Sequence, residues 1–334
     1  MMRKSTWFGA ALLLALSVVV LLLSTGVGSQ GWEWPWRAQA LPDPVQAQIL
    51  WDIRLPRSLG AWLAGALLGL SGAVAQGLFR NPLADPYLLG SASGASLGVS
   101  VYMGAWGGSL SATGWATRLG MTGAAFAGAV LAVVLTLMLA RGVHQTLRLL
   151  LAGVVVGVVL GAVTSLASLL HPEVLLAMQG FLLGSTAFVG WSASMTMAWA
   201  WALCLGLALA MARVLDALAL GESTARSLGM PLGLARVTLI ATLSLATGAA
   251  VAQTGLIAFV GLAAPHAVRS RVHTTHAGLL VLSSLMGGVL LLAADVLARS
   301  VVPAQELPVG AFTAVLGGGY LLWRMHAGQR GGAA

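Results

Sequence analysis

The segment from Ser58 to Leu78 limits the folds open to this chain more than any other part of the sequence. It is 21 residues long and carries no charge, and it lies between Arg57 and Arg80. A helix needs about 20 such residues to cross the ~30 Å hydrocarbon layer of a membrane. We therefore predict a membrane-spanning helix here, with the two arginines close to its ends.

The composition of the whole chain extends this prediction. Hydrophobic residues make up 58% of the 334 residues and charged residues only 8%, whereas a soluble domain has roughly 45–50% and 25%. The apolar runs are continuous and lack the alternation that a membrane β-barrel needs. The sequence thus predicts an all-α integral membrane protein that forms one transmembrane domain over residues 1–334, in contact with the lipid bilayer.

Apolar runs long enough to serve as membrane spans recur along the chain. We count ten of them, at residues 8–23, 58–78, 88–106, 121–140, 147–170, 191–212, 237–253, 255–268, 277–297 and 307–325. Residues 171–190 are too short and too broken by glycine for a span, so we expect an outer partial helix. The first run resembles a signal-peptide core, but the cleavage-like Ala38-Gln39-Ala40 lies too far beyond it, so we expect this run to be retained.

The basic residues provide a separate test of this layout. With a cytoplasmic N-terminus, the layout places twelve of the 17 basic residues on the cytoplasmic side: Arg3, Lys4, Arg80, Arg141, Arg148, Arg213, Arg226, Arg236, Arg269, Arg271, Arg324 and Arg330. This agrees with the usual excess of Lys and Arg on that side. The sequence therefore favours ten spans with both termini in the cytoplasm. The same residues, scattered in ones and twos, form no patch for nucleic acid.

Acidic residues and histidines give little support to chemistry within the membrane. The nine acidic residues all lie in or near predicted loops, so none provides the mid-membrane charge of a proton or ion relay. His273 and His276 are three residues apart, but a solvated loop pair explains them better than a metal site does. We expect no metal, no cofactor and no catalytic residue. A stand-alone secondary carrier and a membrane-embedded enzyme are the weaker alternatives.

Two features indicate a soluble partner. Lys4 is the only lysine of the chain, and a phosphate-binding P-loop needs a lysine in its glycine-rich loop, so another polypeptide must hydrolyse any ATP that is used. The longest polar stretch, residues 213–236, carries Gly229 and Pro231, which are typical of a helix end. We expect a short helix, a turn and a second short helix on the cytoplasmic surface, with an ordinary loop as the alternative.

Five blocks of sequence resemble a known family. In order along the chain they are RLPRSLGAWLAGALLGLSGAVAQGLFRNPLADPYLLG, LRLLLAGV, LALGESTARSLGMPL, GLIAFVGLAAPHAVR and ADVLARSVVPAQELPVGAFTAVLGGGYLLW. Together they look like the FecCD-type permeases of ABC importers for ferric siderophores, haem and vitamin B12. The resemblance covers the chain from Arg54 to Trp323, in order and in spacing.

The resemblance implies a type II ABC importer permease with about ten transmembrane helices, in the inner membrane of a bacterium. Such a permease works as a homodimer with the translocation path along the dimer axis. Two cytoplasmic ATPase subunits and one periplasmic substrate-binding protein complete the importer. An iron chelate, haem or a ferric siderophore, is the expected substrate, and cobalamin is the alternative.

The resemblance also assigns residues to a docking surface for the binding protein. In the family, outer arginines receive glutamates of that protein, and the matching positions here are Arg54, Arg57 and Arg299. Charge-assisted pairs of this kind steer a partner and fix its register. The structural alternative is that these arginines reach the membrane interface and pair locally with Asp52 and Asp295.

A second group of residues matches the helices that couple the permease to its ATPase. This segment, about residues 214–232, would lie in a cleft of the ATPase and transmit its closure to the attached spans. The residues expected to carry that role are Leu220, Gly221, Glu222, Ala225, Arg226 and Gly229.

The resemblance also covers a gate position and a turn. Thr146 matches a cytoplasmic gate residue, although Leu147 departs from the family pattern and the threonine is an equally good N-cap for the fifth span. The family's most recognisable turn is present as Arg80, Asn81, Pro82, Asp85 and Pro86. Its prolines end a helix, and its polar side chains can satisfy freed backbone groups, so its role can be purely structural.

Overall fold

The computed structural model describes residues 4–28, 31–32, 44–106, 115–140, 146–170, 172–302 and 306–330. Almost all of these residues are helical. The helices are α1 (Lys4–Thr25), α2 (Pro44–Ile49), η1 (Leu50–Arg54), α3 (Leu55–Phe79), η2 (Pro86–Leu89), α4 (Ser91–Trp106), α5 (Trp115–Leu139), α6 (Thr146–Leu170), α7 (Pro172–Leu183), α8 (Trp191–Ala210), α9 (Ala212–Ala219), α10 (Glu222–Ser227), α11 (Leu232–Thr254), α12 (Val260–Arg269), α13 (His276–Ser300) and α14 (Val309–Arg330). A two-stranded hairpin, β1 (Val27–Gly28) with β2 (Gly31–Trp32), follows α1.

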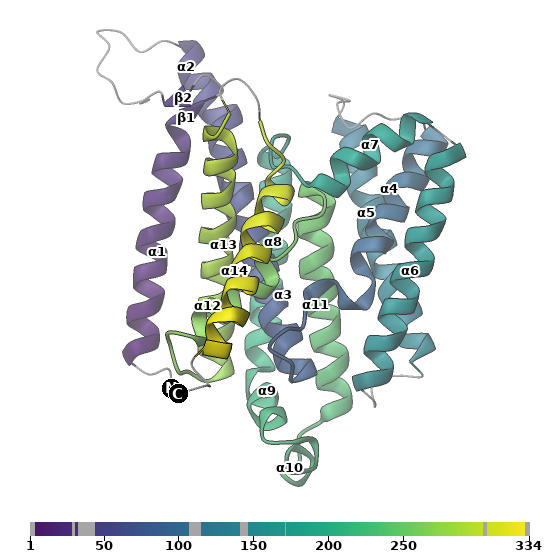
Figure 1. The fold of residues 1–334 in the computed structure, drawn as a ribbon, viewed down its shortest axis with the longest axis vertical. Coiled ribbons are helices and arrows are strands. Elements are labelled where there is room, and N and C mark those ends of the chain that lie inside the picture. Colours follow the sequence, from purple (N-terminus) through teal and green to yellow (C-terminus); the bar gives the residue numbers. More distant parts are fainter. Residues whose placement is uncertain are drawn as a thin grey trace.

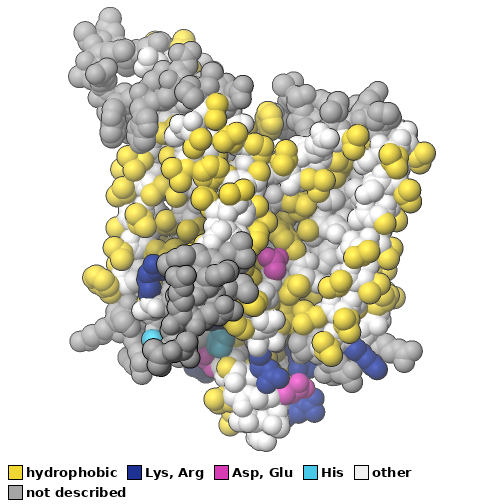
Figure 2. Space-filling model, viewed as in Figure 1, with side chains coloured by type: hydrophobic (Ala, Val, Ile, Leu, Met, Phe, Trp, Pro, Cys, Tyr) yellow, Lys and Arg dark blue, Asp and Glu magenta, His cyan; other side chains and the backbone are white. Residues whose placement is uncertain are grey.

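The helices stand side by side between two ends of the molecule (Figure 1). We call the end that carries α9 and α10 the lower end, and the end that carries α2 and α7 the upper end. In this view α4–α7 lie on one side, α1, α12 and α13 lie on the other, and α3, α8 and α11 lie between them. Apolar side chains cover the flanks, while most charged side chains on this face gather toward the lower end (Figure 2).

Length and composition identify the membrane-spanning helices among the described residues. Seven are long and apolar enough to cross a membrane, and they contain the segments Thr6–Thr25, Pro44–Phe79, Leu119–Leu139, Leu147–Leu170, Trp191–Ala210, Leu232–Thr254 and His276–Ser300. A shorter apolar helical segment, Val309–Tyr320, belongs to α14. The two remaining expected spans, residues 88–106 and 255–268, are present as passages that start with a break.

These two broken passages differ from the continuous helices that the sequence predicted. The first runs through the 3₁₀ turn η2 before α4, which has only 16 residues. The second is an extended segment at residues 255–259 followed by α12. Because α12 has ten residues, it is about 15 Å long, half of what a bilayer crossing needs. Broken helices of this kind occur in transporters where the freed backbone is buried in protein.

The breaks lie against each other inside the bundle. The Tyr87 hydroxyl of η2 donates to the carbonyl of Ile257, at 3.1 Å. The ring of Pro86 occupies the space where a side chain at Gly261 would lie. Backbone bonds from Leu256 to Phe181 (2.9 Å) and from Ser185 to Thr254 (2.8 Å) satisfy further groups at the second break. These contacts pair several backbone groups of the irregular segments within the protein.

α3 is the central helix, buried along almost its whole length. Small residues bring it into backbone contact with α13. A Cβ added to Gly65 would overlap the carbonyl oxygen of Gly287, and one added to Gly69 would overlap that of Ser283. Such small-residue seams allow membrane helices to gain close van der Waals contact. The predicted span Ser58–Leu78 is therefore the core around which the other helices pack.

The partial helix expected within residues 171–190 is also present. It is α7, which lies across the upper end rather than along the bundle (Figure 1). The chain then returns through Gly184, whose backbone has a φ of +66°. That left-handed conformation suits glycine, and it turns the chain from α7 toward α8.

Candidate functional site

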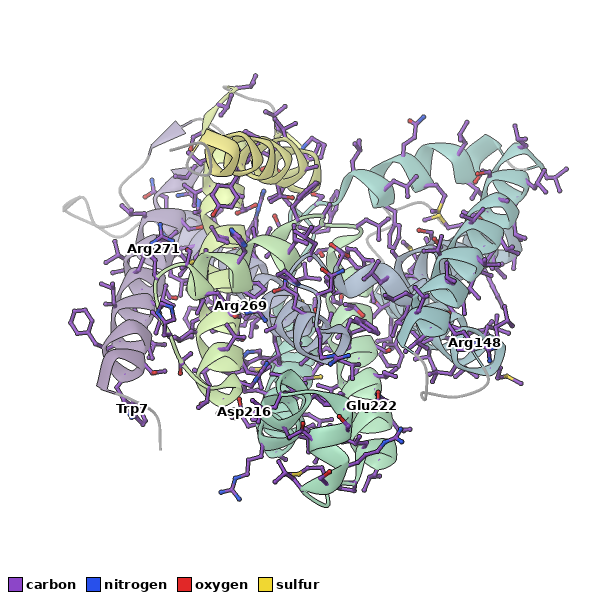
Figure 3. The ribbon with its side chains drawn as sticks, turned by 60° about the horizontal axis from the view of Figure 1, so that its bottom comes forward. Trp7, Arg148, Asp216, Glu222, Arg269 and Arg271 are labelled. Carbon is purple, nitrogen blue, oxygen red and sulfur yellow. The ribbon has the colours of Figure 1, made fainter. Side chains whose placement is uncertain are left out.

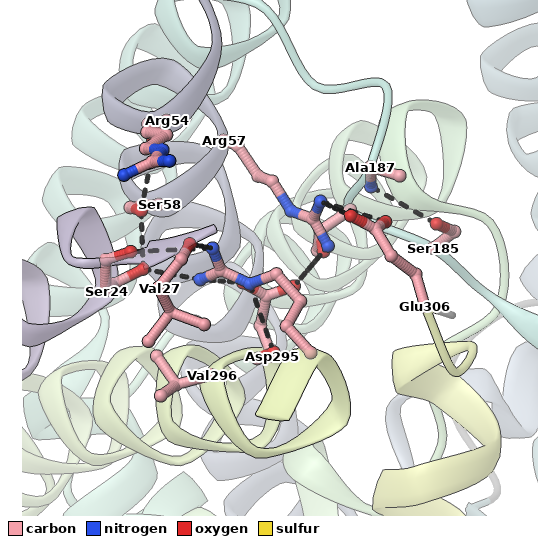
Figure 4. Close-up of polar contacts among 12 residues, drawn as sticks. Ser24, Val27, Arg54, Arg57, Ser58, Ser185, Ala187, Asp295, Val296 and Glu306 are labelled. Atoms are coloured by element: carbon pink, nitrogen blue, oxygen red, sulfur yellow. Dashed lines mark hydrogen bonds and ion pairs between the residues drawn. The ribbon is translucent and has the colours of Figure 1, made fainter. Parts of the chain in front are cut away.

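Arg57 lies at the upper end of α3 and is 8% exposed. Its Nη2 donates to Oδ1 of Asp295 at 3.2 Å, and its Nη1 donates to both carboxylate oxygens of Glu306 at 2.8 and 3.0 Å. Pro56, at the start of α3, is followed directly by this arginine. The structure therefore places one of the three expected docking arginines in a buried ionic cluster (Figure 4).

Arg299 approaches the same cluster from α13 and is also 8% exposed. Its Nη2 lies 2.8 Å from Oδ2 of Asp295 and 2.6 Å from Oγ of Ser24. Its Nη1 donates to the carbonyl of Val27 at 3.1 Å. The guanidinium group thus holds the end of α1 and the start of the hairpin against α13.

Asp295 is the centre of the cluster, with 1% of its surface exposed. It lies between Arg57 and Arg299, and Thr186 of the α7–α8 connection donates to it as well. A buried carboxylate is tolerated when charges and hydrogen bonds surround it in this way. The expectation that every acidic residue lies in or near a loop needs this refinement, because Asp295 lies within α13, five residues before its end.

Arg54 belongs to the same end but is more exposed than the other two arginines. It closes the π-helical turn η1, and its Nη1 donates to the carbonyl of Thr25 at 3.2 Å. Arg54 and Arg57 are three residues apart on continuous helix, so they lie on one side of it. The local partner predicted as an alternative, Asp295, is confirmed for Arg57 and Arg299. The docking role of the three arginines stays a prediction.

The lower end carries the two short helices that the sequence predicted between residues 213 and 236 (Figure 3). Gly221 joins them with a φ of +117°, a conformation that residues other than glycine rarely adopt. α10 ends in a Schellman motif, in which Met230 donates to the carbonyl of Ala225 and Gly229 donates to that of Arg226. Gly229 has a φ of +71°. The expected helix stop is therefore confirmed.

Glu222 ties this helix pair to the bundle. Its Oε1 accepts from Arg226 at 2.6 Å, and its Oε2 accepts from Arg236 of α11 at 2.8 Å. Because Arg236 and then Arg226 donate to it, the pKa of the Glu222 carboxyl lies below its ordinary value. Arg236 is 6% exposed, so the contact joins a surface helix to a buried position at the start of α11.

Asp216 makes a second connection, from α9 to α13. Its Oδ1 accepts the backbone N–H of His276 at 2.9 Å and lies 2.7 Å from Nδ1 of that imidazole. Satisfying a free N–H at a helix start stabilises the helix. His276, expected as half of a solvated loop pair with His273, is instead an ordered contact between two helices.

The remaining expected coupling residues divide into exposed and buried positions. Leu220 is 71% exposed and Arg226 is exposed, so both face outward from the helix pair. Ala225 is fully buried and packs against the core. A partner that binds here would therefore contact Leu220 and Arg226, with Ala225 supporting α10 from beneath.

The recognisable turn after α3 satisfies its own backbone, as the sequence predicted. Oδ1 of Asn81 accepts the N–H of Leu83 at 2.9 Å, and Oδ1 of Asp85 accepts the N–H of Tyr87 at 2.8 Å. Arg80 ends α3 with a φ of +48°. The exposed part of the turn is Arg80 to Leu83, while Pro86 is buried. The expected bonds from backbone N–H groups to the polar side chains of this turn are therefore present.

The last two expectations concern the gate residue Thr146 and the absence of a metal site, and both involve residues outside the described ones. Thr146 begins α6, and its side chain is not among those that the structure describes. In the described part of the chain, no three His, Cys, Asp or Glu residues come together in a way that could hold a metal ion.

Sequence reasoning missed three residues that the structure brings to these sites: Asp216, Arg236 and Glu306. Asp216 lies in the first helix of the predicted pair and Arg236 lies just after the second, so both belong to the polar stretch that the sequence singled out. Glu306 gave no signal, because its partner Arg57 lies 249 positions away.

A helical bundle of this length and apolarity, with two broken passages meeting in its interior, defines a multi-pass membrane transport protein. Comparison with known proteins then gives the family. The chain belongs to the FecCD transport family, whose model matches residues 12–327. Members of this family are permeases of ABC importers, and the fold is that of a type II ABC importer permease.

Individual relatives support the same conclusion. The chain is 38% identical over 322 residues to the proteins called vitamin B12 import system permease protein BtuC in Salmonella typhi and Salmonella typhimurium, with 95% of each chain covered. A solved inward-facing structure, assigned provisionally as a metal-chelate type ABC transporter, matches with a TM-score of 0.82 and 30% identity, covering 94% of this chain and 98% of that one. PsaBC from Streptococcus pneumoniae shares the fold at 18% identity and a TM-score of 0.52.

Proposed function

We propose that this chain is the permease subunit of an ATP-driven importer that carries vitamin B12 across the inner membrane of a bacterium. The observation that carries the proposal is the 38% identity to vitamin B12 permeases over 95% of both chains. The sequence alone favoured an iron chelate and kept cobalamin as the alternative. The relatives support cobalamin better than an iron chelate.

Haem or a ferric siderophore is the second candidate. The structural relative of metal-chelate type favours it, and cobalamin is itself a bulky metal chelate. Substrates of this size and rigidity need a wide path more than a tight polar site. Selection among them is therefore expected to lie with the periplasmic binding protein.

Uptake into proteoliposomes separates the two candidates. The permease is reconstituted with its cognate ATPase subunits and binding protein, and ATP-dependent accumulation of labelled cyanocobalamin, haem and a ferric hydroxamate siderophore is measured. We expect accumulation of cyanocobalamin alone. Uptake of an iron chelate without cyanocobalamin would contradict the first candidate, and uptake without ATP would indicate a secondary carrier.

The assembly follows from the same proposal. A second copy of the chain, two ATPase subunits and one binding protein complete the importer. The lower end faces the cytoplasm, because Lys and Arg are enriched on the cytoplasmic side of membrane proteins and the Lys and Arg side chains on the face shown in Figure 2 lie mostly toward this end. The start of α1 and the end of α14 also lie toward it (Figure 1). The upper end then faces the periplasm.

The helix pair α9–α10 is the proposed contact for the ATPase. Its exposed surface includes Leu220 and Arg226, while Glu222 and Asp216 join it to α11 and α13. A push on the pair would therefore be transmitted to two spanning helices at once, which is a rigid-body route to opening and closing.

The upper arginines are the proposed contact for the binding protein, with Arg54 as the most accessible of them. Reversing its charge with Arg54→Glu is expected to abolish capture of the loaded binding protein by purified permease. Unchanged capture would contradict the assignment. Arg57 and Arg299 are poor targets for the same reversal, because a carboxylate at either position would face Asp295 in a buried site.

A further inference from the structure

Arg57 pairs with two carboxylates that differ greatly in their exposure to solvent. Asp295 is 1% exposed and contacts Arg57, Arg299 and Thr186. The Glu306 side chain is 41% exposed, and both of its oxygens lie on a single nitrogen of Arg57. Asp295 is therefore a permanent part of the fold, whereas Glu306 can leave Arg57 for water without opening the core.

Glu306 also lies in the connection that leads from α13 into the membrane helix α14. It lies three residues before Val309, the first residue of α14, in the segment that joins α13 to α14. The N–H of Leu307 contacts the carbonyl of Ala298 at 3.4 Å, and the N–H of Gly310 donates to the carbonyl of Gly184 at 3.3 Å. Among the described residues, the ion pair with Arg57 acts together with these backbone contacts to position the upper end of α14.

We propose that Glu306 is an exchangeable carboxylate that occupies Arg57 until a glutamate of the docking protein replaces it. This inference rests on the proposed docking of a binding protein at the upper arginines. The exchange replaces one charge-assisted hydrogen bond by another of the same kind. Arg57 therefore keeps two carboxylates throughout, Asp295 and either Glu306 or the arriving glutamate. Removing the second one without a replacement would leave a buried charge less well compensated.

The exchange has a mechanical consequence. When Glu306 leaves Arg57, the segment ahead of Val309 loses that ion pair, and the start of α14 is held by its backbone contacts. Docking on the upper surface therefore changes the contacts of a membrane helix before ATP is used. The exchange also lowers the affinity of the complex, because the arriving glutamate must first displace Glu306. Weak docking suits a binding protein that has to leave after each delivery.

Affinity measurements with a matched pair of variants test this inference. Glu306→Gln removes the resident charge. Asp52→Asn removes one charge from an exposed position at the same end, within the turn η1 that also contains Arg54. The dissociation constant for the cognate binding protein is measured on permease–ATPase complexes in nanodiscs. We expect Glu306→Gln to bind about two- to fivefold more tightly, the range for losing a partly exposed ion pair, and Asp52→Asn to stay near wild type.

The outcomes separate the two proposals. Equal tightening in both variants would show a general charge effect and overturn the exchange, as would unchanged or weaker binding by Glu306→Gln. If Arg54→Glu abolishes capture while Glu306→Gln binds as wild type does, docking stands and the exchange is wrong. If Arg54→Glu and Glu306→Gln both bind as wild type does, the docking surface itself is misplaced. Labelling of the buried Cys204 by a maleimide dye, which requires unfolding, checks that each variant is folded.

Discussion

Oδ1 of Asp216 lies 2.9 Å from the backbone nitrogen of His276 and 2.7 Å from its Nδ1, so one carboxylate on α9 holds the first residue of α13. The same helix has 25 residues, and Asp295 and Arg299 lie in its last two turns. At 1.5 Å per residue it is about 37 Å long. One rigid helix therefore connects the proposed ATPase contact to the proposed docking surface.

Replacing Asp216 by alanine is expected to reduce the ATP hydrolysis that loaded binding protein stimulates. The variant removes the contact with His276 through which a movement of α9 would reach α13. Losing a helix-start acceptor also costs about 1 kcal/mol of stability. Asp216→Asn keeps an oxygen acceptor for the His276 N–H and should retain more of the stimulated activity. The measurement is stimulated ATPase activity of the reconstituted importer, together with the thermal midpoint from Cys204 labelling. Equal activity in wild type and Asp216→Ala would show that this contact is not part of the coupling route.

The ion pair of Glu222 with Arg236 predicts a defined pH dependence. The folded-state pKa of Glu222 lies below the ordinary value of 4.5, so its stabilisation is complete above pH 4.5 and is lost as the pH falls through the folded-state pKa. The difference in thermal midpoint between wild type and Glu222→Gln should be constant from pH 8 to about pH 5.5 and should shrink below pH 4.5. A difference that already falls between pH 8 and pH 6 would mean that another group controls this contact.

A charge exchange gives an independent control for the same pair. The double variant Glu222→Arg with Arg236→Glu keeps opposite charges on α10 and α11, whereas each single variant places like charges together. We expect the double variant to recover part of the stimulated ATPase activity that the single variants lose. No recovery would contradict the idea that the opposite charges of this pair alone account for the activity.

Sequence reasoning located the elements well but missed how two of them are broken. The run Ser58–Leu78 and the helix pair around Gly221 were predictable, because apolar length and glycine positions are local signals. The start of α12 was not, since Phe259 adopts a φ of +68° that no local rule assigns to an aromatic residue. Nor could spacing show that Glu306 meets Arg57, because that contact depends on the packing of α3 against α13.

The small-residue seam between α3 and α13 predicts a sharp contrast between two glycines. A side chain at Gly65 would overlap the carbonyl oxygen of Gly287, whereas nothing lies within 4 Å of a Cβ at Gly206 of α8. Gly65→Val should therefore separate the two helices, at a cost of about 1–3 kcal/mol or more, and Gly206→Val should be tolerated. Yield of folded protein and the midpoint of Cys204 labelling report the effect. A stable Gly65→Val variant would contradict the close approach of these helices.

The hydrogen bond between Tyr87 and Ile257 joins the two broken passages, so removing it should loosen the second one specifically. Tyr87→Phe leaves the ring in place and takes away the donor, which typically costs about 1 kcal/mol and leaves the Ile257 carbonyl buried without it. We expect faster backbone hydrogen exchange in the segment from Gly255 to Val260, with α3 unaffected. Tyr102→Phe is the matched control, since Tyr102 stacks on Trp106 through its ring with centroids 5.4 Å apart. If the backbone N–H groups from Gly255 to Val260 exchange at the wild-type rate in both variants, the segment is held by its backbone contacts to Phe181 and Ser185 rather than by Tyr87.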